Sequence, residues 1–118
     1  MEDLVMINTA VVRACFESYL KQDRDAAESL IADDFLFTSP QDDHIDRAAF
    51  FERCFPTAGR VRTHELLHVV PSDGEDVFVM YEYELLTGER HRNVEVLTVR
   101  DGKVVEAQVF FGGDYTAI

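Results

Sequence analysis

The sequence has few cysteines, few basic residues and no long apolar run, and each shortage argues against a class of protein. Its two cysteines, Cys15 and Cys54, do not form a CxxC pair, so we expect inert core thiols in a reduced compartment. Eleven basic residues against 23 acidic ones give a net charge of −12, which repels nucleic acid and anionic membranes. No apolar segment approaches the roughly 18 residues of a membrane span, and the N-terminus lacks the basic start of a signal peptide. We therefore expect a cytoplasmic protein that binds neither nucleic acid nor membranes.

Helical periodicity dominates the first half of the chain. At 118 residues the chain has the length of a single domain, residues 1–118, and no repeat or linker divides it. Residues 4–21 form the longest amphipathic pattern, with apolar positions at three- and four-residue spacing. These positions are Ile7, Val11, Ala14, Cys15 and Leu20. The pattern predicts a helix over residues 4–21.

Two shorter helices and one strand are expected before the midpoint of the chain. Residues 26–31 are predicted to form a helix capped by Asp23, or by Asp25 in a capping box with Glu28. Residues 35–38 are predicted to form a short strand, and residues 41–45 a polar loop. A further helix is expected over residues 47–55, capped by Asp46 and ended by Pro56.

After Gly59 the sequence becomes rich in β-branched and aromatic residues. Residues 61–70 and 77–86 are predicted to be long strands, separated by a turn at residues 71–74. Helices followed by a meander of antiparallel strands are typical of an α+β fold, with the helices against one face of a sheet.

Two further β-rich runs, residues 93–99 and 104–112, flank Asp101-Gly102 and predict a β-hairpin. A two-residue turn would mix apolar and charged residues on both faces. A three-residue turn, with Gly102 left-handed in a G1 bulge, separates them better. One face then carries Asn93, Glu95, Leu97, Val105, Ala107, Val109 and Phe111, and the other carries Val94, Val96, Thr98, Glu106, Gln108 and Phe110. Glu95 becomes a single acid in a mostly apolar wall, where a carboxylate is costly unless it is paired or used.

His64-Glu65-Leu66-Leu67-His68 matches the HExxH motif of zinc hydrolases. The zinc chemistry requires a helix, which brings both histidines to one metal ion. The motif lies in a predicted strand, where residues four apart stand about 13 Å from each other. We therefore treat a zinc site at His64, Glu65 and His68 as the weaker hypothesis and expect no metal.

Residues 23–40, with a short helix, Ala32-Asp33-Asp34, a strand and a Ser-Pro stop, resemble the early segment of the nuclear transport factor 2-like superfamily. Residues 92–113, with Val99–Val105 and Val109–Gly112, resemble its SnoaL-like and ketosteroid-isomerase-like branches. This resemblance covers nearly the whole chain. It implies a cystatin-like α+β fold, in which three N-terminal helices pack on a cone-shaped, strongly curved antiparallel sheet with a ligand pocket at its open end.

The resemblance also implies positions for functional residues. Ketosteroid isomerases use a tyrosine on the first helix, an aspartate before a proline as the base, and a protonated aspartic acid on a late strand. These positions fall on Cys15, Ser39 and Glu95. Cys15 and Ser39 cannot play those roles, so we expect no authentic steroid isomerase. Glu95 is also the acid that the hairpin register isolates.

Two function classes remain open at this stage. The first is a cofactor-independent isomerase, cyclase or hydrolase acting on an apolar or carbonyl-bearing small molecule, with Glu95 handling a proton. The second is a non-catalytic ligand-binding or dimerisation domain, in which Glu95 is satisfied by Asn93, a tyrosine hydroxyl or water. Either way, we expect the pocket to be lined by Cys15, Tyr19, Phe37, Asn93, Leu97, Ala107, Val109 and Phe111.

No cofactor is required by either function class. His44 and His91 are expected in solvated loops. A homodimer through the sheet is expected because the face with Val94, Val96 and Phe110 leaves apolar area that a small monomer would hardly expose.

Overall fold

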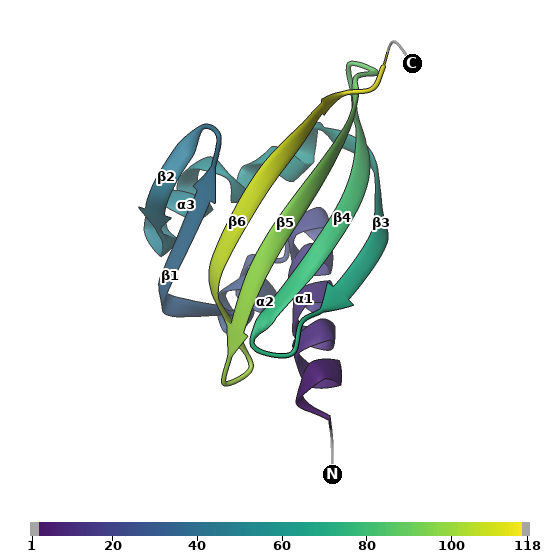
Figure 1. Ribbon diagram of the computed structural model, residues 1–118. Helices are drawn as coiled ribbons and strands as arrows, with labels where there is room; N and C mark the ends of the chain where they lie inside the picture. Colours follow the sequence, from purple (N-terminus) through teal and green to yellow (C-terminus); the bar gives the residue numbers. More distant parts are fainter. Residues whose placement is uncertain (1–2, 117–118) are drawn as a thin grey trace.

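The computed structural model describes residues 3–116 of the chain. Its elements, in order, are α1 (Leu4–Lys21), α2 (Arg24–Leu30), β1 (Ile31–Ser39), β2 (Asp42–Asp46), α3 (Arg47–Arg53), the 3₁₀ helix η1 (Phe55–Arg60), β3 (Val61–Pro71), β4 (Asp76–Leu85), β5 (Arg90–Arg100) and β6 (Lys103–Asp114). The strands form one curved sheet in the order β2-β1-β6-β5-β4-β3, and the helices lie on one face of it (Figure 1). The predicted α+β fold of three helices on a curved sheet is confirmed. The sheet is not wholly antiparallel, however, because β1 runs parallel to β6.

Aspartate side chains cap all three α-helices. Asp3 accepts a hydrogen bond from the Val5 amide, and Asp46 accepts one from the Ala49 amide at 2.9 Å. Of the two candidate caps for α2, Asp23 is the one used, accepting from the Ala26 amide at 3.2 Å. The capping box with Asp25 is wrong, because Glu28 instead forms an ion pair with Arg24 one helical turn earlier.

The buried face of α1 differs from the predicted one. Val12 and Phe16 pack against the sheet, whereas Ile7 and Leu20 are 37% and 38% exposed. At about 100° per residue, Ile7 lies about 140° around the helix from Val12, and Leu20 lies about 80° around in the other sense. Val11 and Cys15 flank the buried stripe, as expected. None of the helices within residues 3–116 is long and apolar enough to cross a membrane.

The predicted loop at residues 41–45, which includes His44, is wrong, because Asp42–Asp46 form the edge strand β2. Phe37 of β1 pairs with Ile45, and Leu36 pairs with Asp46. Acidic residues are rare in strands, but an edge strand exposes one side to water and tolerates them. The third helix also ends earlier than predicted, at Arg53, and continues as η1 with Pro56 in its first turn.

The hairpin of β5 and β6 has the predicted pairing along most of its length. Glu95 lies opposite Val109, and Leu97 opposite Ala107. The turn itself was predicted wrongly: it has two residues, with both Asp101 (φ 53°) and Gly102 (φ 77°) left-handed. The extra residue falls in β6 between the pairs Thr98–Glu106 and Val99–Val104, so the bulge places Val104, not Val105, in the core.

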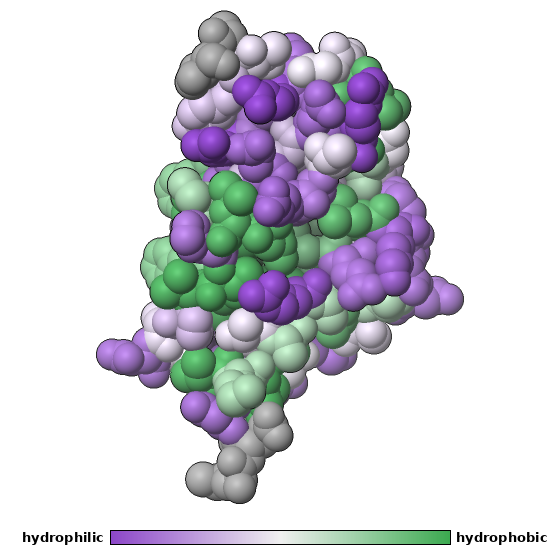
Figure 2. Space-filling view, turned by 90° about the vertical axis from the view of Figure 1, so that its right-hand side faces the viewer, coloured by the Kyte–Doolittle hydropathy of each residue, from purple (hydrophilic) through white to green (hydrophobic). Residues whose placement is uncertain are grey.

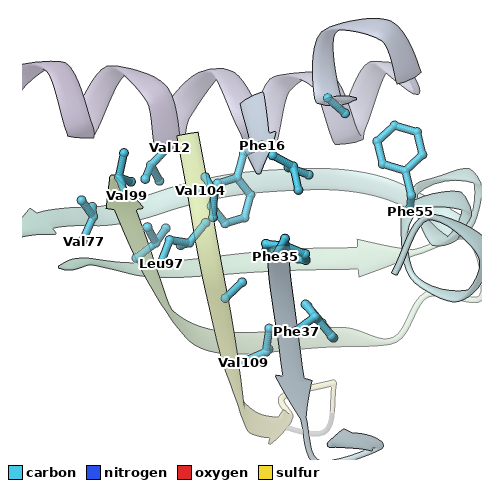
Figure 3. Close-up of a cluster of buried hydrophobic side chains, with 14 of the residues drawn as sticks. Val12, Phe16, Phe35, Phe37, Phe55, Val77, Leu97, Val99, Val104 and Val109 are labelled. Atoms are coloured by element: carbon cyan, nitrogen blue, oxygen red, sulfur yellow. The ribbon is translucent and has the colours of Figure 1, made fainter. Parts of the chain in front are cut away.

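The core lies between α1 and the concave face of the sheet. Figure 3 shows Val12 and Phe16 of α1 above Val77, Leu97 and Val99 of the central strands. A second group around α3 and η1 includes the rings of Phe35, Phe37, Phe50, Phe51 and Phe55.

Candidate functional site

A cavity of about 810 Å³ lies between α1, η1 and the concave face of β4, β5 and β6. Eight of the nine predicted site residues contribute to its wall: Cys15, Tyr19, Phe37, Asn93, Glu95, Leu97, Val109 and Phe111. Ala107 does not, because it lies between its larger strand neighbours Phe37 and Leu97 and is covered by the core. Phe111, 48% exposed, lies at the rim rather than in the interior.

Glu95 is held in the cavity by a directed chain of hydrogen bonds. The Asn93 side-chain amide donates to the Tyr81 hydroxyl at 3.3 Å. The Tyr81 hydroxyl in turn donates to Oε1 of Glu95 at 3.2 Å. Oε2 of Glu95 has no hydrogen-bond partner within residues 3–116 and is not buried, so it is open to the cavity. A proton carried by Glu95 therefore belongs on Oε2, where a bound molecule can reach it.

The surroundings of Glu95 shift its acidity toward neutral. Burial among apolar groups disfavours the charged form and raises the pKa of Glu95 to about 7. The hydrogen bond from Tyr81 favours the carboxylate and lowers the pKa, but it only partly offsets burial. Near pH 7 both protonation states are populated, which is the condition for a group that takes and returns a proton.

Tyr19 and the two thiols are less suited to chemistry. Thr57 donates its hydroxyl proton to the Cys54 carbonyl at 2.6 Å, so Tyr19 must donate to Thr57, also at 2.6 Å. Burial raises the pKa of Cys15 to about 12 and that of Cys54 to about 11, the latter with the help of nearby Asp42. Both thiols are therefore protonated near neutral pH and are poor nucleophiles.

The HExxH segment is part of β3, so its histidines are not one helical turn apart. A bulge at Leu67 shifts the pairing of β3 with β4, and the two histidines end up on different sides of the sheet. His64 lines the cavity, whereas His68 is exposed. Within residues 3–116 no group of three His, Cys, Asp or Glu side chains could hold a metal ion. Because His64 and His68 lie on a strand and face different sides of the sheet, they cannot share one zinc ion, and the zinc hypothesis is wrong.

Phe16 of α1 lines the cavity and was missed as a site residue, as were four ring side chains of the sheet: His64, Tyr81, Tyr83 and His91. Their rings lie next to one another across β3, β4 and β5, with centroids 4.9 Å apart for His64 and Tyr81 and 5.3 Å apart for Tyr83 and His91. The expectation of a loop position for His91 is wrong, because β5 begins at Arg90. The alternation of side-chain direction along β4 could have identified the two tyrosines, because Tyr81 and Tyr83 share a face with the buried Val77 and Val79.

Sequence comparison identifies a family for this chain. The SnoaL-like domain family matches residues 12–107, which include all helices after the first turns of α1 and most of the sheet. No curated protein sequence is significantly similar to the chain.

Solved structures show the same fold at low sequence identity. A nuclear transport factor 2-like protein of unknown function from Mesorhizobium loti is 22% identical, with 96% of this chain and 97% of that chain covered and a TM-score of 0.79. Bal32a, from a soil-derived mobile gene cassette, is 20% identical over 93% of this chain and 92% of that chain, with a TM-score of 0.79. An LEH-like epoxide hydrolase from M. tuberculosis is 18% identical over 92% and 85%, with a TM-score of 0.73. The chain belongs to the SnoaL-like domain family, and it shares its fold with nuclear transport factor 2-like proteins.

Proposed function

We propose that this protein is a cofactor-independent acid–base enzyme, in which Glu95 moves a proton on an apolar, carbonyl-bearing small molecule. The observation that carries the proposal is the position of the Glu95 carboxyl group. One oxygen is fixed by Tyr81 and the other is open to an aromatic cavity large enough for a small molecule. The apolar wall favours a ligand with an apolar body, and the carboxyl group supplies the reactive contact.

The chemistry follows from the two protonation states of Glu95. As a carboxylate, Oε2 takes a proton from the carbon next to a ligand carbonyl, leaving an enolate. As an acid, the same oxygen returns the proton to that carbon or to another one. Return of the proton to a different carbon is an isomerisation. Attack by the enolate carbon on an electrophilic carbon of the same ligand is a cyclisation. A hydrolase would instead use the carboxylate to activate water, and the epoxide hydrolase among the structural neighbours makes that the second reaction class to assay.

Authentic steroid isomerase activity is not part of the proposal. Ser39 stands where the ketosteroid isomerases have their carboxylate base, and Cys15 stands where they have a tyrosine donor. A hydroxyl group is a poor base and a thiol is a weak donor. We expect no appreciable conversion of a β,γ-unsaturated ketosteroid, and rapid conversion that is lost in Glu95→Gln would contradict this expectation.

Proton exchange tests the proposed function without knowledge of the natural substrate. The probe is 2-tetralone, a bicyclic ketone with acidic carbon-bound protons, whose exchange with D₂O is followed by NMR. We expect catalysed exchange that falls by about 10²-fold or more in Glu95→Gln. Glu106→Gln is the matched control, because Glu106 lies on the opposite face of the sheet in the pair with Thr98. Saturable binding of the ketone without exchange would instead assign a ligand-binding domain.

A further inference from the structure

His64 carries the one side-chain nitrogen or oxygen within residues 3–116 that is buried and lacks a hydrogen-bond partner. This atom is Nδ1. The imidazole ring stacks on Tyr81, with ring centroids 4.9 Å apart and an angle of 20° between the ring planes. It also packs against Phe16, with ring centroids 5.8 Å apart. A buried nitrogen without a partner costs stability, so its presence calls for an explanation.

The two nitrogens of His64 lie in different surroundings. Nε2 also lacks a partner within residues 3–116 but is not buried. His64 lines the cavity, and also a smaller polar pocket with Glu65 and Glu82, so we infer that Nε2 is the nitrogen that a ligand in the cavity reaches. A buried N–H group without an acceptor is rarer in proteins than an unpaired acceptor, which places the ring proton on Nε2. The side chains stacked around the ring are Phe16, Tyr81 and Tyr83, and none is a carboxylate or a cation. Burial alone lowers the pKa of His64 to about 4, so the ring is neutral at physiological pH.

Tyr81 connects His64 to Glu95. His64 lies against the Tyr81 ring from β3, and Glu95 accepts a hydrogen bond from the Tyr81 hydroxyl on β5. Two strand spacings, about 10 Å, separate β3 from β5. His64 pairs with Tyr83 and Glu95 with Val79, so the two positions are also offset by four residues along β4. The Tyr81 side chain spans this offset, and both His64 and Glu95 line the same cavity. A donor at Nε2 and an acceptor at Oε2 therefore face one small ligand from two sides.

We propose that His64 is a neutral hydrogen-bond donor that binds the carbonyl oxygen of the ligand through Nε2–H, while Glu95 moves the proton of the neighbouring carbon. This inference rests on the proposed function of Glu95. The proton leaves carbon for Oε2 of Glu95, the electron pair moves onto the carbonyl oxygen, and the Nε2–H group stabilises the resulting oxyanion without transferring its own proton. The ring is then oriented so that Nε2 reaches the ligand, and this orientation leaves Nδ1 without a partner.

The first arm of the test needs no ligand. In ¹⁵N-labelled protein, NMR reports the charge and the tautomer of His64. We expect a neutral ring between pH 5 and 8 with its proton on Nε2. A charged ring at pH 7, or a proton on Nδ1, would overturn the inference whatever Glu95 does.

The second arm uses exchange of 2-tetralone with three variants. His64→Phe keeps a ring against Tyr81 but removes the donor, and we expect about a 10²-fold loss of kcat/KM. His64→Gln keeps an N–H donor near the position of Nε2 and should recover part of this loss. His68→Phe, at the exposed histidine of the same strand, should exchange like wild type. His64→Phe should also melt at a higher temperature, which separates a ligand contact from a structural role. Wild-type exchange in His64→Phe would refute the inference.

The infrared carbonyl stretch of bound ¹³C-carbonyl 2-tetralone reports the hydrogen bond to the carbonyl oxygen, whether or not Glu95 catalyses exchange. A shift to lower frequency that is lost in His64→Phe and kept in Glu95→Gln supports His64 as the donor, even if Glu95 proves not to catalyse exchange. A shift that persists in His64→Phe assigns the carbonyl contact to another group and overturns the inference.

Discussion

The Tyr81 hydroxyl donates to Oε1 of Glu95 at 3.2 Å, across the neighbouring strands β4 and β5. This bond favours the ionised carboxylate, whereas burial of the same carboxyl group favours the neutral acid. The balance places the pKa of Glu95 near 7. Tyr81 therefore tunes the group that we propose to handle the proton.

Removal of the Tyr81 hydroxyl should shift this balance. In Tyr81→Phe, burial is retained and the hydrogen bond is lost, so we expect the pKa of Glu95 to rise above its wild-type value of about 7. Carboxyl titration by ¹³C NMR measures the change. Tyr83→Phe is the control, because no hydrogen bond joins Tyr83 to Glu95. An unchanged or lowered pKa in Tyr81→Phe would show that the bond does not stabilise the carboxylate.

Glu95→Gln should change how stability depends on pH. The pKa of Glu95 is about 7 in the folded state and about 4.5 when unfolded, so between these values the folded state binds the extra proton. Its stability therefore falls as pH rises from 4.5 to 7, and the ionised form is penalised above pH 7. Relative to Glu95→Gln, wild type should gain up to about 3 kcal/mol as pH falls from 7 to 4.5, at about 1.4 kcal/mol per unit.

Thermal or urea unfolding of both proteins at several pH values between 4 and 8 checks this expectation. Comparison with Glu95→Gln cancels the contributions of the other acidic residues. Glu106→Gln, on the opposite face of the sheet, is the control for loss of a carboxyl group outside the cavity. Parallel curves for wild type and Glu95→Gln would mean that Glu95 is paired or exposed.

Gly112 should tolerate no side chain. A Cβ atom at Gly112 would overlap the Arg92 carbonyl oxygen on the neighbouring strand β5, and backbone cannot yield as a flexible side chain does. We expect Gly112→Ala to destabilise the fold by about 1–3 kcal/mol in urea unfolding. Gly59→Ala is the matched control, since a Cβ atom added at Gly59 would meet no other atom within 4 Å. Equal stability of the two variants would contradict the close approach of β6 to β5.

Assembly through the outer face of the sheet stays a prediction. Phe110 and Phe78 are 56% and 44% exposed, and the pairs Phe78–Val96 and Val94–Phe110 make this face apolar. Figure 2, which views the right-hand side of Figure 1, shows hydrophobic surface at mid-height and below, under a largely hydrophilic upper end. Because a small monomer rarely exposes such a patch, we propose a homodimer through this face.

Light scattering at micromolar concentration tests the dimer. We expect twice the monomer mass for wild type and the monomer mass for Phe110→Glu, which buries a charge in the proposed interface. Leu86→Glu is the control, because Leu86 is equally exposed, at 57%, but lies in the turn after β4. A monomeric wild type, or a dimer unaffected by Phe110→Glu, would rule out this interface.

The sequence reveals most of the fold because periodicity and caps act locally. The span of α1, the cap at Asp46 and the pairing of Glu95 with Val109 are all visible in it. The strand β2 is not, because Asp42–Asp46 are poor strand formers and pair with β1 only in the folded chain. The bulge in β6 also depends on tertiary packing, which selects Val104 for the core.

The candidate site could be predicted only as far as single strands allow. Glu95 stands out as one acid in an apolar alternation, and Asn93 and Val109 follow from the same hairpin. Tyr81 and His64 do not, because their contacts depend on the register of β3 and β4, and a bulge at Leu67 changes that register. The HExxH motif indicated His64 only as a zinc ligand, a role that requires a helix and that a strand cannot support.

Titration of the Glu95 carboxyl group by ¹³C NMR, in wild type and without ligand, tests the claim that Glu95 takes and returns a proton near pH 7. We expect a pKa of about 7, because burial outweighs the single hydrogen bond from Tyr81. The resonance is assigned by its absence from Glu95→Gln. A pKa at or below the ordinary value of about 4.3 for glutamate would contradict the claim, since Glu95 would then be a permanently ionised group with no proton to return.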